Sequence, residues 1–492
     1  MTLTVNSVSP KSALWLLIGV TSFIHLFISP WFNLGADEAH YTLYGVFLDW
    51  SYFDHPPMIG WLQAIALLFS QSELALRSIP VVLFIGTSLA LYSLIEKLEP
   101  DNSDWLPFLT VAVVHSGLMF QLIGLTMVPD VPLLFVSVMA VNAIVDLLRD
   151  TSLRRWLFLG VWLGLAGLSK YTAVTLVFSS MLLVAYNRRF DLLKGPGIWL
   201  AIAVSLLLIL PIIYWNFIND WISFSYQIHH GTKGSEWGIA RLVLSQTIQA
   251  VLYTHGIYLA GLVVIAKCLR PGMPLNQQVP LFFALPVLLL FGWNSGYEET
   301  LPHWPIFGWL MLITLIVTYI HGFWQKRWLR IAVYANTAYS LILVLAVQSQ
   351  LLYPWMPFPD NTNLLHDVHG WQQAADKAIK LKASEKTGKQ LKLFVTSWPF
   401  ASRLAWYARP EHVMVADQRY DQFDIWYGSP QDGDAGIVVI PAYSKKNPPK
   451  TGSAGHFSSC QQRGNLPIKV GSRIITTYYF FFCDGYSAGV PR

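Results

Sequence analysis

The stretch Gly197-Ile-Trp-Leu-Ala-Ile-Ala-Val-Ser-Leu-Leu-Leu-Ile-Leu-Pro-Ile-Ile-Tyr-Trp-Asn216 runs for twenty residues without a charged side chain. A helix needs about 20 mainly apolar residues to cross the roughly 30 Å hydrocarbon core of a bilayer. Of the 492 residues in the chain, 54% are hydrophobic and only 12% are charged, whereas a soluble domain carries about a quarter charged residues. The sequence therefore predicts a polytopic α-helical membrane protein.

Apolar segments of this kind recur along the chain as eleven predicted transmembrane spans. The first run has no small-x-small cleavage site, so we interpret it as a retained span and not as a signal peptide. The predicted spans cover residues 12–29, 79–97, 105–124, 130–148, 156–169, 171–187, 197–216, 243–267, 279–294, 305–321 and 331–352.

Lysine and arginine in the short loops predict the orientation, because cytoplasmic loops carry an excess of both. The loops that follow even-numbered spans form a consistent basic set: Lys97, Arg149, Arg154, Arg155, Arg188, Arg189, Lys194, Lys267, Arg270, Lys326, Arg327 and Arg330. We therefore expect a cytoplasmic N-terminus and a C-terminal tail on the outer face of a bacterial inner membrane.

The tail, residues 353–492, changes composition and is predicted to be a separate periplasmic domain after a transmembrane domain of residues 1–352. Strand-like runs at 391–395 and 436–440 flank a predicted helix at 399–407, which indicates a small α/β domain. Cys460 and Cys483 both lie in it, either as a disulfide or as two buried thiols. The net charge of +5 is small and the basic residues form no stripe, so nucleic acid is excluded as a partner.

The predicted outer loops carry most of the acidic residues near the membrane. Charged groups beside lipid are costly and call for a functional hypothesis, although a solvated loop face explains Glu73, Glu298 and Glu299 equally well. The loop over 30–78 contains Ala36-Asp-Glu-Ala-His-Tyr41. Asp37 and Glu38 are either a general base or metal ligand, or a charge pair favoured by the dipole at a helix start.

The other motifs in the predicted outer loops also have a structural interpretation beside a functional one. Tyr52-Phe-Asp-His-Pro-Pro57 predicts a turn or helix start that exposes Asp54 and His55, followed by an apolar helix over 57–71 lying along the membrane surface. Asp130, in Val128-Pro-Asp-Val-Pro132, predicts a helix start. Lys170 is either a snorkelling anchor or a cation that contacts a phosphate. The aromatic run 214–227 and the Pro302-His303-Trp-Pro305 element are typical of a membrane interface.

Taken in order, these motifs together with Gly164-Leu-Ala-Gly-Leu-Ser-Lys-Tyr-Thr-Ala173 and Trp215-Asn…Asp220-Trp-Ile-Ser-Phe224 resemble the bacterial protein O-mannosyltransferase and lipid A aminoarabinose transferase superfamily, over roughly residues 10–320. These are GT-C membrane glycosyltransferases. The resemblance implies inverting transfer of a sugar from a polyprenyl-phosphate donor to an acceptor hydroxyl on a glycolipid or a protein, at the outer face of the inner membrane.

The resemblance also implies roles for single residues. Asp37 is the expected base, with Glu38 beside it, and Lys170 and Arg77 are expected to neutralise the leaving phosphate. The remaining expected substrate-binding residues are Asp54, His55, Asp130, Tyr171 and His303. Relatives place Lys where this chain has His55, which puts phosphate binding there in doubt. A divalent ion among Asp37, Asp54, His55 and Asp130 is an open alternative.

Two other classes of function compete with a glycosyltransferase. A transporter or flippase of lipid-linked sugars would place its charges near the midplane of the spans and would often show inverted repeats. Here the charges gather at one surface and no repeat is visible. A catalytically inactive envelope scaffold would not need the Asp37-Glu38 pair.

Overall fold

The computed structural model describes residues 9–230, 236–358, 363, 365–417, 419–444 and 456–488. The chain forms two compact units whose segments alternate along the sequence. Unit 1 contains Met1–Phe27, Trp50–Ile59 and Arg77–Ala346, and unit 2 contains Ile28–Asp49, Gly60–Leu76 and Val347–Arg492. The predicted division at 352/353 differs from these units, because most of the first outer loop folds with the C-terminal tail.

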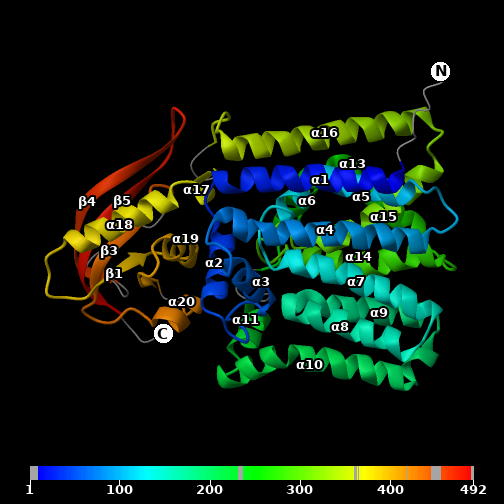
Figure 1. Cartoon of the computed structure of the whole chain (residues 1–492), viewed down its shortest axis with the longest axis horizontal. Helices are drawn as coiled ribbons and strands as arrows, with labels where there is room; N and C mark the ends of the chain where they lie inside the picture. Colours follow the sequence, from blue (N-terminus) through cyan, green and yellow to red (C-terminus); the bar gives the residue numbers. More distant parts are fainter. Residues whose placement is uncertain are drawn as a thin grey trace. The chain divides into compact units, whose positions relative to one another are not determined.

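Unit 1 is helical, and Figure 1 shows its long helices running alongside one another. Most of these helices are apolar around their whole circumference, as expected for elements surrounded by lipid or by other helices. The helices of this unit are α1 (Pro10–Ile28), α4 (Glu73–Leu98), α5 (Leu106–Ser116), α6 (Leu118–Ile123), α7 (Asp130–Arg149), α8 (Leu153–Ser169), α9 (Val174–Tyr186), α10 (Pro196–Ile218), α11 (Ile222–His230), α12 (Ile239–Leu252), α13 (His255–Cys268), α14 (Leu275–Asn294), α15 (Ile306–Gly322) and α16 (Arg327–Leu352).

Six helices in the described part of the chain are long and apolar enough to cross a membrane, or seven if the bent pair α12 and α13 is one span. The predicted span over 243–267 is divided into two helices, because α12 and α13 meet at 112°. Thr254 lies at the bend with a positive φ of 69°, and its hydroxyl accepts a hydrogen bond from Ile257 N–H, which starts a new helix. The predicted span 105–124 is likewise divided, at Gly117. The total of eleven spans stays a prediction.

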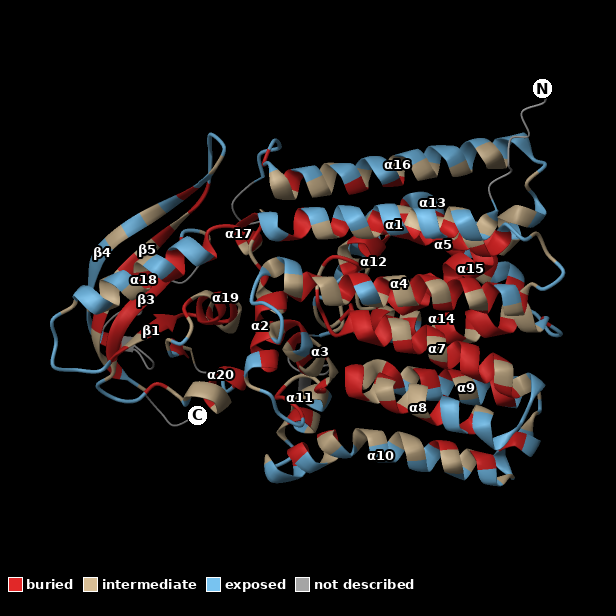
Figure 2. Cartoon of the chain, viewed as in Figure 1, coloured by how far each residue is buried: buried red, intermediate tan, exposed pale blue. Residues whose placement is uncertain are grey.

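The helices of unit 1 differ in how far they are buried. Figure 2 shows α7 mostly buried and α10 and α16 mostly intermediate or exposed. The outward faces of α10 carry large apolar side chains such as Leu207 and Phe217, which suit contact with lipid chains. The inner face of α10 packs closely on α8, where a Cβ at Gly160 would lie 2.7 Å from the Ala201 carbonyl oxygen. Small residues of this kind allow close helix packing in membranes.

The tail portion of unit 2 is built on a five-stranded mixed sheet in the order β2-β1-β3-β5-β4. β1 pairs in parallel with β2 and β3, while β5 pairs antiparallel with β3 and β4. The fully buried β3 reads as one continuous apolar run, as expected of a central strand covered on both faces. The strands are β1 (Leu391–Val395), β2 (Val413–Val415), β3 (Ala435–Pro441), β4 (His456–Val470) and β5 (Arg473–Ser487).

The predicted strand runs coincide with β1 and β3, and the predicted helix coincides with α19 (Trp398–Tyr407). The other helices of the tail are α17 (Leu365–Val368), α18 (Trp371–Ser384) and α20 (Gln422–Tyr427). Cys460 and Cys483 lie opposite each other on β4 and β5 and form a disulfide, which resolves the alternative that the sequence left open.

Most of the first outer loop belongs to unit 2, and its helix α2 packs on α19. In α2 (Ala36–Val46), the His40 ring lies among aromatic rings, and its Nδ1 is 3.1 Å from the Ser402 hydroxyl. Gly45 of α2 approaches α3 (Met58–Leu67) so closely that a Cβ would lie 2.8 Å from Ala64 N. The helix predicted over 57–71 is therefore present as α3, and its position on the membrane surface stays a prediction.

Candidate functional site

The polar centre of unit 1 is an ion pair between Lys170 and Asp130. Lys170 Nζ lies 2.8 Å and 2.9 Å from the two carboxylate oxygens of Asp130. Only 9% of the Lys170 side chain and 3% of the Asp130 side chain are exposed. A buried charge is stable only when it is paired, so each of these residues depends on the other.

The ends of two helices bring this pair together. Asp130 is the first residue of α7, as the sequence predicts, but its carboxylate does not cap that helix. Lys170 follows the last residue of α8 in an extended conformation, with its N–H bonded to the Ala166 carbonyl. The Asp130 carboxylate, which the motif predicts to lie at a helix start, therefore pairs with Lys170 at the end of α8.

The loop before α15 adds His303 and Trp304 to the pair. His303 Nε2 lies 3.5 Å from Asp130 Oδ2, and Lys170 Nζ lies 5.4 Å from the centre of the Trp304 ring, a cation–π distance. The Pro302 carbonyl accepts hydrogen bonds from Gln249 Nε2 at 3.1 Å and Tyr253 Oη at 3.2 Å. The bend between α12 and α13 thus fixes the loop that carries His303.

His303 is neutral at pH 7. Burial lowers the pKa of its imidazole to about 4; Asp130 opposes this shift, while Lys170 and His55 add to it. A neutral imidazole can donate one hydrogen bond and accept another, but it adds no charge. The electrostatic effect of His55 also places the Asp54-His55 turn close to this cluster.

Helix α11 holds the turn that carries Asp54 and His55. Ser223 donates a 2.7 Å hydrogen bond to the Tyr52 carbonyl, and Gln227 donates one of 2.7 Å to the Asp54 carbonyl. Within the turn, Tyr52 N–H donates to the His55 carbonyl at 3.2 Å. The turn predicted from the Asp-His-Pro-Pro motif is therefore fixed through its backbone by residues from the 214–227 run, to which the sequence gave only an interface role.

An apolar groove of about 450 Å³ reaches Tyr171, the residue that follows Lys170 in the chain. Its walls come from α7, α8, α9 and α10, and one end is formed by Tyr171 and Phe224, whose rings are 5.8 Å apart. The middle of the groove is lined by aliphatic side chains and one glycine, including Leu163, Gly167, Val174, Val177, Ile209 and Ile213. Lys170 and Tyr171 are neighbours in the chain, so the Lys170 backbone adjoins this end of the groove, while the Lys170 ammonium is paired with Asp130.

In unit 2, Asp37 and Glu38 lie in the first turn of α2 and differ in their roles. Glu38 is buried, and its Oε2 accepts a hydrogen bond from Gly35 N–H at 3.1 Å, which caps the start of α2. The Ala36 N–H donates to the Asp367 carboxylate, which is also paired with the buried Arg403. Glu38 is thus the helix-start charge that the sequence allowed, whereas Asp37 is half-buried.

Of the remaining predicted site residues, Arg77 is fully buried in α4. Within the residues that the structure describes, no group of three or more His, Cys, Asp or Glu side chains could hold a metal ion. Sequence reasoning missed Gln249 and Tyr253, although a glutamine inside an apolar span was a usable signal.

Comparison with known proteins gives the class of this site. A family model described as dolichyl-phosphate-mannose-protein mannosyltransferase matches residues 54–215. A lipid A galacturonosyltransferase of Rhizobium johnstonii, RgtD, is 24% identical over 363 residues, which cover 70% of this chain and 73% of that protein.

Solved structures share the fold. The crystal structure of ArnT from Cupriavidus metallidurans bound to undecaprenyl phosphate aligns with a TM-score of 0.61 at 13% identity, over 97% of this chain and 99% of that one. The apo form aligns with a TM-score of 0.59 at 14% identity, over 86% and 92%. Together these likenesses identify the chain as a multi-pass membrane glycosyltransferase of the GT-C type.

The low pKa of His303 predicts a pH dependence of stability. Between pH 6.5 and about 4 the His303 imidazole takes up a proton in the unfolded chain but stays neutral in the folded chain. The contribution of His303 to the free energy of unfolding is therefore fully present above pH 6.5 and is lost as the pH falls through this window. The full loss is about 3 kcal/mol, from about 1.4 kcal/mol per pKa unit. We expect the melting temperature of the detergent-purified chain to fall more steeply from pH 7 to pH 4.5 than that of His303→Gln. Parallel curves for the two proteins would contradict a buried neutral His303.

Proposed function

We propose that the chain transfers a sugar from a polyprenyl-phosphate donor to a hydroxyl group of a glycolipid acceptor of the lipid A type, with inversion at the anomeric carbon. The reaction takes place at the outer face of the inner membrane. The observation that carries the proposal is the apolar groove that reaches Tyr171, the next residue in the chain after Lys170 of the buried Lys170–Asp130 pair. A polyprenyl chain needs an apolar channel, and its phosphate needs a cation at the end of that channel.

The charges around Lys170 suit a leaving phosphate. In the structure Asp130 balances the charge of the Lys170 ammonium. The ammonium can therefore be buried and preorganised without being an unpaired charge. Negative charge grows on the phosphate oxygen as its bond to the sugar breaks, and a preorganised cation stabilises that change. The neutral His303 beside the pair can donate a hydrogen bond to the same group without adding charge.

The bond changes require a base for the acceptor. The acceptor oxygen attacks the anomeric carbon, the bond from that carbon to the phosphate oxygen breaks, and polyprenyl phosphate leaves with both electrons. The hydroxyl proton passes to a carboxylate, which we assign to Asp37. Its neighbour Glu38 accepts a hydrogen bond from Gly35 N–H at the start of α2, so Glu38 positions the helix that carries Asp37.

The proposals of a glycolipid acceptor and of a reaction at the outer face are supported by separate observations. The relative from Rhizobium johnstonii carries lipid A in its name, and this supports a glycolipid acceptor. The Cys460–Cys483 disulfide in unit 2 supports an oxidising compartment. This agrees with the charge pattern of the loops, which assigns the tail to the outer side.

The Asp37 assignment predicts a split between two adjacent carboxylates. Asp37→Asn removes the base and should lower the rate of transfer by about 10²–10⁴-fold, the usual contribution of general base catalysis. Glu38→Gln keeps an oxygen that can accept from Gly35 N–H, so it should retain most activity. The measurement is the mass of lipid A from a deletion strain that expresses each variant, with membrane levels compared by immunoblot. Full activity in Asp37→Asn at normal expression would remove Asp37 as the base.

The effect of Lys170 on use of the donor can be measured separately from its effect on stability through the ion pair with Asp130. Lys170→Met leaves Asp130 buried and unpaired, which should destabilise the chain by about 3–5 kcal/mol. Lys170→Met combined with Asp130→Asn removes both charges and should regain most of the lost melting temperature. If Lys170 contacts the donor phosphate, the stable double variant still uses the lipid donor poorly, seen as a raised apparent KM for the donor. Unchanged donor dependence in the double variant would reduce Lys170 to a structural residue.

A further inference from the structure

A second groove in unit 1, of about 510 Å³, lies among α4, α7 and α8. It uses another face of α7 than the apolar groove described above: Phe135, Met139 and Asp146 instead of Ile144 and Leu147. Its walls are mostly apolar, and its floor is closed by Asn142, whose amide donates to the Ala90 and Val138 carbonyls at 3.0 Å. The groove therefore has a fixed floor and an open apolar face.

The length of the groove matches one leaflet of a bilayer. On α4 its lining runs from Gly86 to Lys97, and on α7 it runs from Phe135 to Asp146. Each is a separation of eleven residues, or about 16 Å at roughly 1.5 Å per residue. Half of the hydrocarbon core of a bilayer is about 15 Å thick. A phospholipid acyl chain would therefore fill the groove from the headgroup level to the midplane.

Charge is confined to one end of the groove. Lys97 Nζ lies 2.9 Å from Asp146 Oδ2, and Arg155 Nη1 lies 3.2 Å from the same oxygen. Arg155 Nε also lies 3.7 Å from Asp150 Oδ2. With Arg149, which donates to the Lys97 carbonyl, three basic side chains face two carboxylates, which leaves a net charge of +1 at the mouth. Arg155 is 41% exposed, so its guanidinium can reach a further acceptor.

We infer that this groove binds an anionic phospholipid of the leaflet at the Lys97 end of the helices. The headgroup phosphate accepts from Arg155 and Lys97, and one acyl chain lies along Met139 and Phe135. Basic pockets between transmembrane helices are a recurrent means of binding acidic lipids. The lipid is neither the donor nor the acceptor of the proposed reaction, and the inference does not rest on that reaction.

The expected role of the lipid follows from the helices it touches. α7 begins at Asp130 and α8 ends just before Lys170, so a lipid wedged between their opposite ends packs against both helices that form the buried pair. Bound lipid adds contacts to the folded state only, and it therefore raises the melting temperature by mass action.

The test is native mass spectrometry and thermal melting of the detergent-purified full chain. Dioleoyl phosphatidylglycerol should bind more tightly, and stabilise more, than dioleoyl phosphatidylcholine, which has the same acyl chains and no net charge. Arg155→Gln leaves Asp146 paired with Lys97 and should weaken phosphatidylglycerol binding about five-fold, the effect of one basic side chain near a membrane surface. Met139→Trp narrows the groove and should weaken binding of both lipids.

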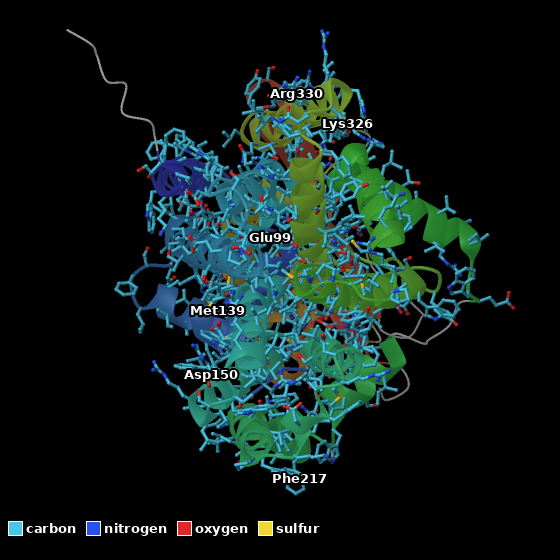
Figure 3. The ribbon with its side chains drawn as sticks, turned by 90° about the vertical axis from the view of Figure 1, so that its right-hand side faces the viewer. Glu99, Met139, Asp150, Phe217, Lys326 and Arg330 are labelled. Atoms are coloured by element: carbon cyan, nitrogen blue, oxygen red, sulfur yellow. A yellow bond between two sulfur atoms is a disulfide. The ribbon has the colours of Figure 1, made fainter. Side chains whose placement is uncertain are left out.

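Arg330→Gln is the matched control. Seen from the loop end of unit 1, Figure 3 shows Arg330 and Lys326 well away from Met139 and Asp150, which mark the flank that carries the groove. This variant should bind phosphatidylglycerol as the native chain does. Equal binding of the two lipids by the native chain, or equal loss in Arg330→Gln and Arg155→Gln, would overturn the inference. It would also fall if sn-glycerol 3-phosphate, which has the charge but no acyl chain, stabilised the chain as strongly as the lipid.

Discussion

The buried pair between Lys170 and Asp130 is the interaction on which the rest of unit 1 depends. It joins the end of α8 to the start of α7 at a depth where neither charge is stable alone. His303 and Trp304 complete its surroundings, and their loop is fixed by hydrogen bonds from Gln249 and Tyr253. Gln249 and Tyr253 lie four residues apart at the end of α12, on one face of that helix, so both can donate to the Pro302 carbonyl.

Unit 2 holds the start of α2, which carries Asp37 and Glu38, in a fixed conformation. Glu38 and Asp367 satisfy the first amides of α2, and Arg403 neutralises Asp367 while lying 4.4 Å from the centre of the Trp371 ring. A Cβ at position 35 would lie 2.7 Å from the Asp367 carboxylate, which explains why the residue before this helix is glycine. The tail thus supports the outer loop directly, and the two segments fold as one unit.

Much of this architecture could be predicted from the sequence, because long apolar runs without charges leave few alternatives to transmembrane helices. The helices α1, α4, α7, α10 and α16 and the strands β1 and β3 fall close to their predicted positions. The break at Thr254 could not be predicted, since it depends on a positive φ and a local cap within a run that remains apolar on both sides. The union of the outer loop with the tail was also missed, because aromatic packing around His40 involves residues more than 350 positions apart.

The site, like the fold, could be predicted from the sequence only in part. The motifs pointed to Asp130, Lys170 and His303 one at a time, and the structure shows that they form a single cluster. The sequence could not separate the roles of Asp37 and Glu38, because adjacent carboxylates look alike until one of them is seen to cap the helix. It gave no reason to connect Ser223 and Gln227 with the Asp54-His55 turn, since that contact is made to backbone carbonyls that any residue would offer.

The most direct test of the account is reconstitution of the purified chain in liposomes with undecaprenyl-phosphate-linked sugars and lipid A. Phosphorus NMR would follow the release of undecaprenyl phosphate, and proton NMR of the product would give its anomeric configuration. The account predicts one undecaprenyl phosphate released for each sugar transferred, with the configuration inverted. A product that retains the configuration of the donor, or transfer that requires a nucleotide sugar in place of the lipid-linked donor, would contradict it.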